Sequence, residues 1–134
     1  MLKQSITYED FNGDQRTEDF FFNLTSKELL ELDRSVDGGF ESSLNKAISN
    51  QDVYSIYDLI QKTILKAYGQ KSEDGRFFKK TPELTEEFEV SAAYQSMLQN
   101  FIDNPDLANN FITGILPKDL REKAAKANAE NKSI

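Results

Sequence analysis

The spacing of the apolar residues changes once along this chain, and that change most constrains its fold. Up to Leu24, apolar side chains tend to recur at every second residue, as expected for strands with one buried face. From Thr25 onward they recur every three or four residues, which is typical of amphipathic helices. The sequence therefore predicts an α+β fold, predominantly α-helical, with an N-terminal β-hairpin packed on a bundle of about five helices.

Residues 1–24 predict the hairpin. The turn is indicated by Asn12-Gly13-Asp14, since Asn and Gly tolerate positive φ. The return strand, residues 17–24, places Phe21 on the face opposite its other large apolar residues. An isolated hairpin is only marginally stable in water. Its aromatic face must therefore pack on the helices or on another chain. The residues expected on that face are Leu2, Ile6, Tyr8, Phe20, Phe22 and Leu24.

Residues 25–69 predict three helices. The first begins at Thr25, which forms a capping-box pattern with Glu28, and ends before the glycines at 38–39. A short second helix covers residues 40–48. The third begins near Asp52 and carries a long apolar stripe, with Gly69 as its left-handed C-terminal residue.

The second half of the chain predicts a charged loop at residues 70–81 and two more helices. One helix is expected to run without a break from 83 to 102, with Val90 on its buried stripe. The other is predicted from Asn104 and Pro105, which form an N-terminal signal, to Gly114 and Pro117. We expect one globular domain over residues 1–117 (hairpin 1–24, helical 25–117). Residues 118–134 are expected to form a polar tail, disordered or loosely helical.

Composition narrows the possible functions. The 23 acidic and 16 basic residues give a net charge of −7, which argues against nucleic acid as a partner. No apolar run exceeds three residues, so we expect no membrane span and no signal peptide. The chain has no cysteine and no histidine, which removes disulfides, the usual metal ligands and the commonest general base. We therefore expect a cytoplasmic protein that is not an enzyme and uses no cofactor.

Two patterns in the sequence could in principle carry chemistry. The loop at Asp10 resembles the start of a calcium loop, but its sixth and twelfth positions are Gln15 and Phe21 instead of Gly and Glu. Carboxylate pairs such as Glu86-Glu87 are frequent, yet the sequence brings none of them into a cleft. A hydrolase or transferase that uses carboxylates stays open as a minor alternative.

A small set of apolar residues is left for binding a partner, because most of the ten phenylalanines fall at periodic core positions. Spare aromatic surface is expected on the hairpin, at the start of the second helix and in the charged loop. The last predicted helix supplies the remaining apolar candidates. The candidate partner-binding residues are Phe21, Phe40, Phe77, Phe78, Ile112, Ile115 and Leu116.

Seven segments of the chain resemble the tail assembly chaperones of long-tailed, siphovirus-type phages of Gram-positive bacteria. The similarity runs in register over about residues 1–120. The segments are ITY at 6–8, NG at 12–13, RTEDFFFNL at 16–24, EL at 28–29, DGG at 37–39, ILKAYGQKSEDGRF at 64–77 and NFITGILPK at 110–118.

The resemblance implies a function without catalysis. Such chaperones bind the long, aggregation-prone tape measure protein before the tail tube polymerises around it. They are then released and are absent from the mature virion. Many relatives are also made as a longer, frameshifted form that recruits the tail tube protein. We expect in addition a weak homo-oligomer. Two alternatives stay open: a tail completion or connector protein that remains in the virion, and an acidic inhibitor of a host protein.

Overall fold

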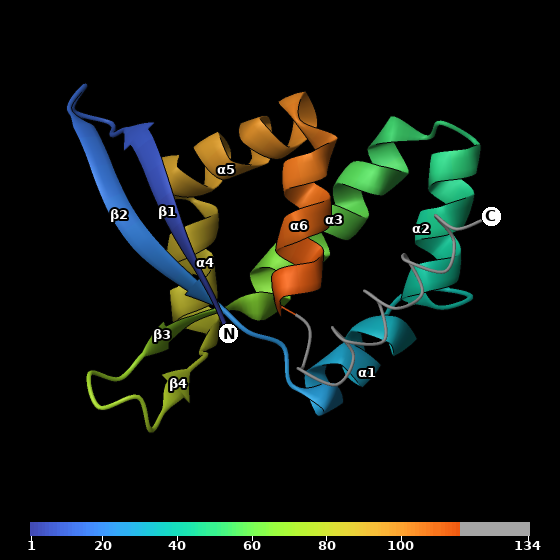
Figure 1. Cartoon of the computed structure of the whole chain (residues 1–134), viewed down its shortest axis with the longest axis horizontal. Helices are drawn as coiled ribbons and strands as arrows, with labels where there is room; N and C mark the ends of the chain where they lie inside the picture. Colours follow the sequence, from blue (N-terminus) through green and yellow to red (C-terminus); the bar gives the residue numbers. More distant parts are fainter. Residues whose placement is uncertain (116–134) are drawn as a thin grey trace, which may run out of the picture.

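The computed structural model describes residues 1–115 and confirms a mostly helical α+β fold (Figure 1). The predicted tail at 118–134 lies outside these residues. In chain order the elements are β1 (Leu2–Glu9), β2 (Gln15–Phe22), α1 (Ser26–Arg34), α2 (Phe40–Ser49), α3 (Val53–Ala67), β3 (Tyr68–Lys71), β4 (Phe78–Lys79), α4 (Pro82–Glu89), α5 (Ala92–Asp103) and α6 (Pro105–Ile115).

The predicted hairpin is present and its turn is fixed by one carboxylate. β1 pairs with β2 in antiparallel register from Leu2↔Phe22 to Glu9↔Gln15. The Asp10 side chain accepts hydrogen bonds from the backbone N–H groups of Asn12 and Asp14, and Gly13 takes φ = 86°. The calcium-like spacing of these residues is therefore explained by turn chemistry.

The prediction of a charged loop at residues 70–81 is wrong in part, because this segment contains a second, smaller hairpin. β3 follows α3 directly and pairs with β2, and β4 pairs with β3, so the sheet order is β1-β2-β3-β4. Gly69 lies in β3 and not in the left-handed helix end that we expected. A Cβ at Gly69 would lie 2.6 Å from the Phe78 ring and 2.8 Å from the Lys79 carbonyl oxygen. Glycine is required there by close packing and not by its φ.

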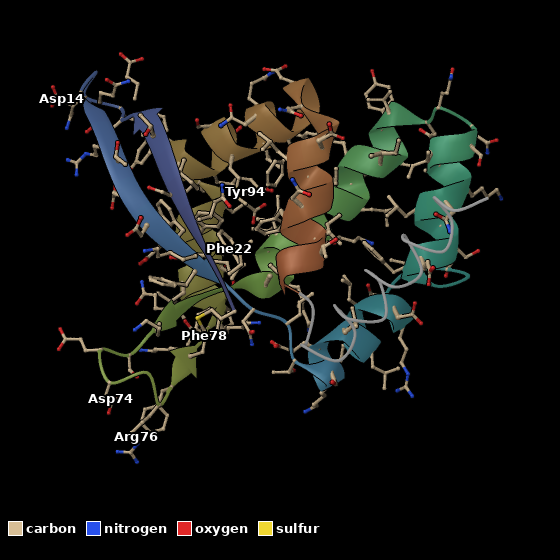
Figure 2. The ribbon with its side chains drawn as sticks, viewed as in Figure 1. Asp14, Phe22, Asp74, Arg76, Phe78 and Tyr94 are labelled. Atoms are coloured by element: carbon tan, nitrogen blue, oxygen red, sulfur yellow. The ribbon has the colours of Figure 1, made fainter. Side chains whose placement is uncertain are left out.

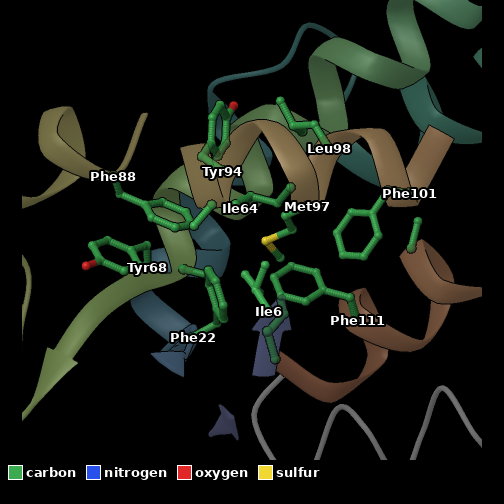
Figure 3. Packing of buried hydrophobic residues seen from close by; sticks show 14 of the residues in the cluster. Ile6, Phe22, Ile64, Tyr68, Phe88, Tyr94, Met97, Leu98, Phe101 and Phe111 are labelled. Atoms are coloured by element: carbon green, nitrogen blue, oxygen red, sulfur yellow. The ribbon is translucent and has the colours of Figure 1, made fainter. Parts of the chain in front are cut away.

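An aromatic cluster joins one face of the sheet to the helices (Figure 3). The Phe22 side chain is fully buried, and its ring lies 5.0 Å from that of Phe111 in α6 and 5.8 Å from that of Phe88 in α4. The rings of Tyr68 and Phe88 stack at 4.1 Å. These contacts cover the aromatic face of the hairpin. The hairpin needs them, because by itself it would be only marginally stable in water.

The prediction of a single helix at 83–102 is wrong, because two helices, α4 and α5, occupy this segment. Ser91 caps α5, since its Oγ accepts a hydrogen bond from the N–H of Tyr94 at 3.1 Å. Val90, which we expected in the core, lies at the break and is 72% exposed. Phe88, two residues earlier, takes the buried position instead.

α2 and α3 form a helical pair at the end of the molecule away from the β3–β4 hairpin (Figure 1). The turn between them is tight. Asp52 caps α3 by accepting a hydrogen bond from the N–H of Ser55, and Gln51 has φ = 54°. This left-handed conformation is uncommon for a residue with a side chain. The turn therefore holds the ends of the two helices in a defined geometry.

Candidate interaction surface

The apolar side chains that the fold leaves exposed gather mainly at turns and helix ends. Among residues 1–115, ten large apolar side chains are exposed. An exposed apolar group is common on proteins, so single examples need no explanation. Groups of them on a rigid scaffold are candidates for binding. The ten are Met1, Phe11, Leu30, Ile48, Val53, Tyr54, Phe77, Val90, Ile102 and Leu107.

The turn between α2 and α3 carries three of these ten within seven residues. Ile48 is 55% exposed, Val53 66% and Tyr54 86%. We call Ile48, Val53 and Tyr54 the α2–α3 tip. Because Asp52 and Gln51 fix the turn, these side chains are presented on an ordered frame, which limits the entropy lost on binding.

Each of the two hairpins carries one exposed phenylalanine at its turn. Phe11 is 83% exposed in the β1–β2 turn, and Phe77 is 64% exposed beside the β3–β4 turn. Figure 2 shows the two turns, marked by Asp14 and Asp74, projecting away from the helices. Their electrostatic surroundings differ. Phe11 lies in a turn that also carries the acidic residues Asp10 and Asp14, whereas the guanidinium carbon of Arg76 lies 5.3 Å from the centre of the Phe77 ring.

A hollow of about 400 Å³ lies beside the helical pair formed by α2 and α3. Val36, Ala47 and Leu59 contribute apolar surface to it. Polar and charged side chains make up the rest of the described lining. These are Asp37, Ser43, Lys46, Asn50, Asp52, Ser55 and Asp58. The volume is in the range of pockets that hold small groups or inserted side chains.

A family model of phage tail assembly chaperones matches residues 1–134, which is the whole chain. The chain belongs to this family. No curated protein matches the chain, and no solved structure matches it. Family membership implies partners among the tail proteins and suggests a role that is not enzymatic.

In this chaperone the candidate residues on the two hairpins have different exposure. Phe77 is exposed. Phe78 is half-buried and packs against Gly69, while the Lys80 ammonium lies 5.7 Å from its ring centre. Phe21 is half-buried on the outer face of the sheet, with the Lys71 ammonium 5.7 Å from its ring.

The candidates on helices are mostly part of the core. Phe40 and Ile112 are half-buried and pack against the main cluster, and Ile115 has no exposed surface. Ile115 therefore cannot contact a partner unless the core opens. Leu116 lies outside the described residues. Among the described residues, the structure brings none of Phe40, Ile112 and Ile115 together with Phe77 in one surface patch (Figure 1).

The exposure of the α2–α3 tip and of Phe11 was not predicted from the sequence. Phe11 lies between the turn residues Asp10 and Asn12, where no hydrophobic period requires it, and this signal could have identified it. The sequence gives no such signal for Val53 and Tyr54. They stand at the start of a helix, where apolar residues are expected to be buried. Their exposure follows from how α2 and α3 pack.

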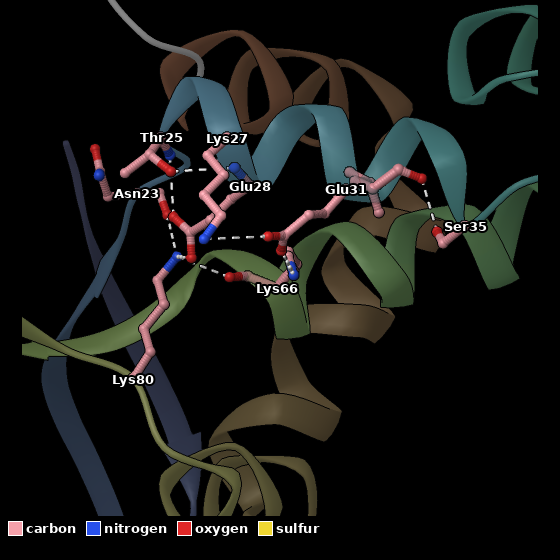
Figure 4. A network of polar contacts seen from close by, with 9 residues as sticks. Asn23, Thr25, Lys27, Glu28, Glu31, Ser35, Lys66 and Lys80 are labelled. Carbon is pink, nitrogen blue, oxygen red and sulfur yellow. Dashed lines mark hydrogen bonds and ion pairs between the residues drawn. The ribbon is translucent and has the colours of Figure 1, made fainter.

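A lysine joins the sheet and the helices of the chaperone (Figure 4). The Lys80 ammonium donates hydrogen bonds to the Asn23 carbonyl at 2.6 Å, the Glu28 carboxylate at 2.7 Å and the Lys66 carbonyl at 2.8 Å. Burial would raise the pKa of Glu28, but Lys80 and the backbone N–H of Thr25 outweigh it and lower this pKa. Burial lowers the pKa of Lys80. The contacts indicate a structural role for this ion pair.

The described residues offer few groups for chemistry. Burial raises the pKa of Tyr94 to about 12, and Tyr94 belongs to the core. Among residues 1–115 no three acidic side chains converge on a point that could hold a metal ion. Within the same residues, every helix is too short or too polar to cross a membrane.

Proposed function

We propose that this protein binds the tape measure protein of its phage, keeps it soluble while the tail tube assembles, and is then released. The observation that carries the proposal is the family match over the whole chain. We place its action in the host cell cytoplasm, and the host among Gram-positive bacteria. It is not an enzyme in this proposal, and the mature virion lacks it.

The physical character of the chain supports the proposal. A tape measure protein exposes apolar helical stripes until the tube encloses it, and an apolar surface on the chaperone can cover them reversibly. The net charge of −7 keeps such a complex soluble. Release requires a modest affinity at each contact, so many copies along one long client supply the total strength.

We further propose that the α2–α3 tip contacts the client. Its three side chains are exposed, apolar and held on a fixed turn. They are largely exposed to solvent, so covering them with a client helix gains free energy without disturbing the fold.

A pull-down tests the binding step. The immobilised full-length protein is incubated with tape measure segments and with scrambled segments of equal composition and helicity. We expect selective retention of the natural segments, and equal retention of both would contradict the proposal. Mass spectrometry of purified virions tests release: the proposal expects little or none of this protein, whereas a stoichiometric amount would indicate a completion or connector protein.

A further inference from the structure

A second group of exposed apolar side chains lies at the turn between α5 and α6. Ile102 is in the last turn of α5 and Leu107 is in the first turn of α6, and both are exposed. Neither belongs to the hydrophobic core, although both helices contribute several residues to it. We call Ile102 and Leu107 the α5–α6 tip.

The α5–α6 tip and the α2–α3 tip lie along the same edge of the molecule. Figure 1 shows both turns at the upper edge, with α3 and α6 running down from them. α3 and α6 contact each other, so the two tips belong to neighbouring parts of one scaffold. Together the tips hold five of the ten large apolar side chains that are exposed among residues 1–115. Exposed apolar groups that gather in one place mark binding surfaces, whereas single ones do not.

The chain around both tips is acidic. Residues 47–61, which follow Lys46 and include the α2–α3 turn, hold two aspartates and no lysine or arginine. Residues 81–115, from α4 to α6, hold six acidic residues and no lysine or arginine. Two of these six, Asp103 and Asp106, are exposed and stand next to the α5–α6 tip in the sequence. A partner that covers the apolar side chains therefore gains from positive charges beside its own apolar surface, and a negatively charged partner is repelled.

The tips suit a helix better than an extended strand. An added strand needs the open edge of a sheet to bind its backbone groups, and both tips consist of helix ends and turns. An amphipathic helix satisfies its own backbone and presents a continuous apolar stripe along one face. Such a stripe can cover side chains on two neighbouring turns.

We propose that the two tips together bind one amphipathic helix whose apolar stripe is flanked by lysine or arginine. The stripe covers the apolar side chains, and the flanking cations lie beside Asp52, Asp103 and Asp106. These ion pairs are exposed and therefore weak, which suits a contact that is later released. That the helix belongs to the tape measure protein rests on the proposed function.

Binding of three synthetic helices to the full-length protein tests the preference for charge. The peptides share one apolar stripe and have equal helicity, and they carry lysine, glutamine or glutamate beside the stripe. We expect the lysine peptide to bind about tenfold more tightly than the glutamine peptide at low salt, and the difference to shrink at high salt. The glutamate peptide should bind most weakly. Fluorescence anisotropy measures the dissociation constants, and three equal constants, or no binding of the lysine peptide, would overturn the proposal.

A substitution at the α5–α6 tip tests whether the helix binds there. Leu107→Gln should weaken binding of the lysine peptide about fivefold or more, because it removes an apolar group from the contact. Val90→Gln is the matched control, since it makes a similar change at an exposed position in the turn between α4 and α5. It should bind the peptide like the wild type.

A pair of charge changes tests the role of the aspartates. The double variant Asp103→Asn, Asp106→Asn should weaken binding of the lysine peptide and leave that of the glutamine peptide unchanged. The double variant Glu83→Gln, Glu86→Gln is its control, because it removes the same charge from α4. Glu83 stands in the first turn of α4, as Asp106 does in α6. The control should bind both peptides like the wild type.

Equal effects of the tip variants and their controls would overturn the proposal, provided that circular dichroism shows each variant to be folded like the wild type. The pull-down with tape measure segments separates this result from a failure of the proposed function. If Leu107→Gln and Tyr54→Ser retain those segments like the wild type, the client binds elsewhere and only the proposed surface is wrong. If the lysine peptide binds at the tips but no tape measure segment is retained, the proposed function fails and the surface stands.

Discussion

Lys80 is the side chain that ties the sheet to two helices, and it yields the clearest prediction at the scale of a residue. Its three hydrogen bonds end on the β2–α1 connection, on α1 and on the last turn of α3. Lys80→Met would leave the Glu28 carboxylate and two carbonyl oxygens without this partner. We expect the free energy of unfolding to fall by about 2 to 3 kcal/mol. This is at the lower end for such pairs, because the side chains of Lys80 and Glu28 are still 20% and 21% exposed.

Lys66→Met is the matched control for Lys80→Met. The Lys66 ammonium pairs with Glu31 at 2.6 Å, but these side chains are 34% and 46% exposed. Pairs of that kind contribute at most about 1 kcal/mol. Urea denaturation measures both variants, and equal losses would mean that Lys80 is not a structural centre.

The same ion pair predicts how stability depends on pH. The pKa of Glu28 in the folded protein is below its ordinary value of 4.5, so the folded state favours the carboxylate. This contribution is complete well above pH 4.5 and is lost as the pH falls through the lowered pKa. We expect the free energy of unfolding to fall more steeply with acid in the wild type than in Glu28→Gln. Parallel curves from urea denaturation between pH 6 and about pH 3 would contradict this assignment.

Among the helices and strands, the break between α4 and α5 depends on one cap. Ser91→Ala removes the acceptor for the Tyr94 N–H and the hydroxyl that donates to the Phe88 carbonyl at 2.6 Å. We expect the free energy of unfolding to drop by about 1 kcal/mol, the usual cost of losing such a cap. Ser96→Ala is the control, because Ser96 is not a cap and its hydroxyl makes only a 3.5 Å contact with the Thr7 carbonyl. Equal stabilities of the two variants in thermal unfolding would show that the cap is unimportant.

The elements predicted correctly from the sequence are those marked by local sequence patterns. The hairpin follows from period-two spacing and turn residues, and the starts of α1, α3 and α6 follow from Thr25, Asp52 and the Asn104-Pro105 pair. β3 and β4 carry no such signal. They are four and two residues long, and β3 exists because it pairs with a strand more than 40 residues earlier. Val90 was misplaced because its spacing to Tyr94 and Met97 continues a helical stripe across the break.

For the molecule as a whole, the sequence predicted the family but not which large apolar side chains the fold leaves exposed. Phe77 was predicted as a candidate and is exposed, whereas Ile115 is a core residue. Whether an aromatic side chain faces water is decided by the packing of distant elements, as the contrast between the neighbours Phe77 and Phe78 shows. Periodicity identifies one face of a helix, but it cannot identify a tip that extends past its packing partner.

The proposed contact between the α2–α3 tip and the client can be tested by one substitution. Tyr54→Ser removes a ring that is 86% exposed, so the stability of the fold should change by less than about 0.5 kcal/mol. The amount of tape measure segment retained in the pull-down should fall several-fold. Val90→Ser serves as the control, because it is 72% exposed at a turn in another part of the fold, and it should retain the client like the wild type.

Co-expression with the tape measure protein of the same phage tests the central claim most directly. The readout is the fraction of tape measure protein in the soluble part of the lysate, with and without this protein. We predict a large rise in that fraction with the wild type and a smaller rise with Tyr54→Ser. An unchanged soluble fraction, with this protein itself folded and abundant, would contradict the proposal that it acts as a chaperone of the tape measure protein.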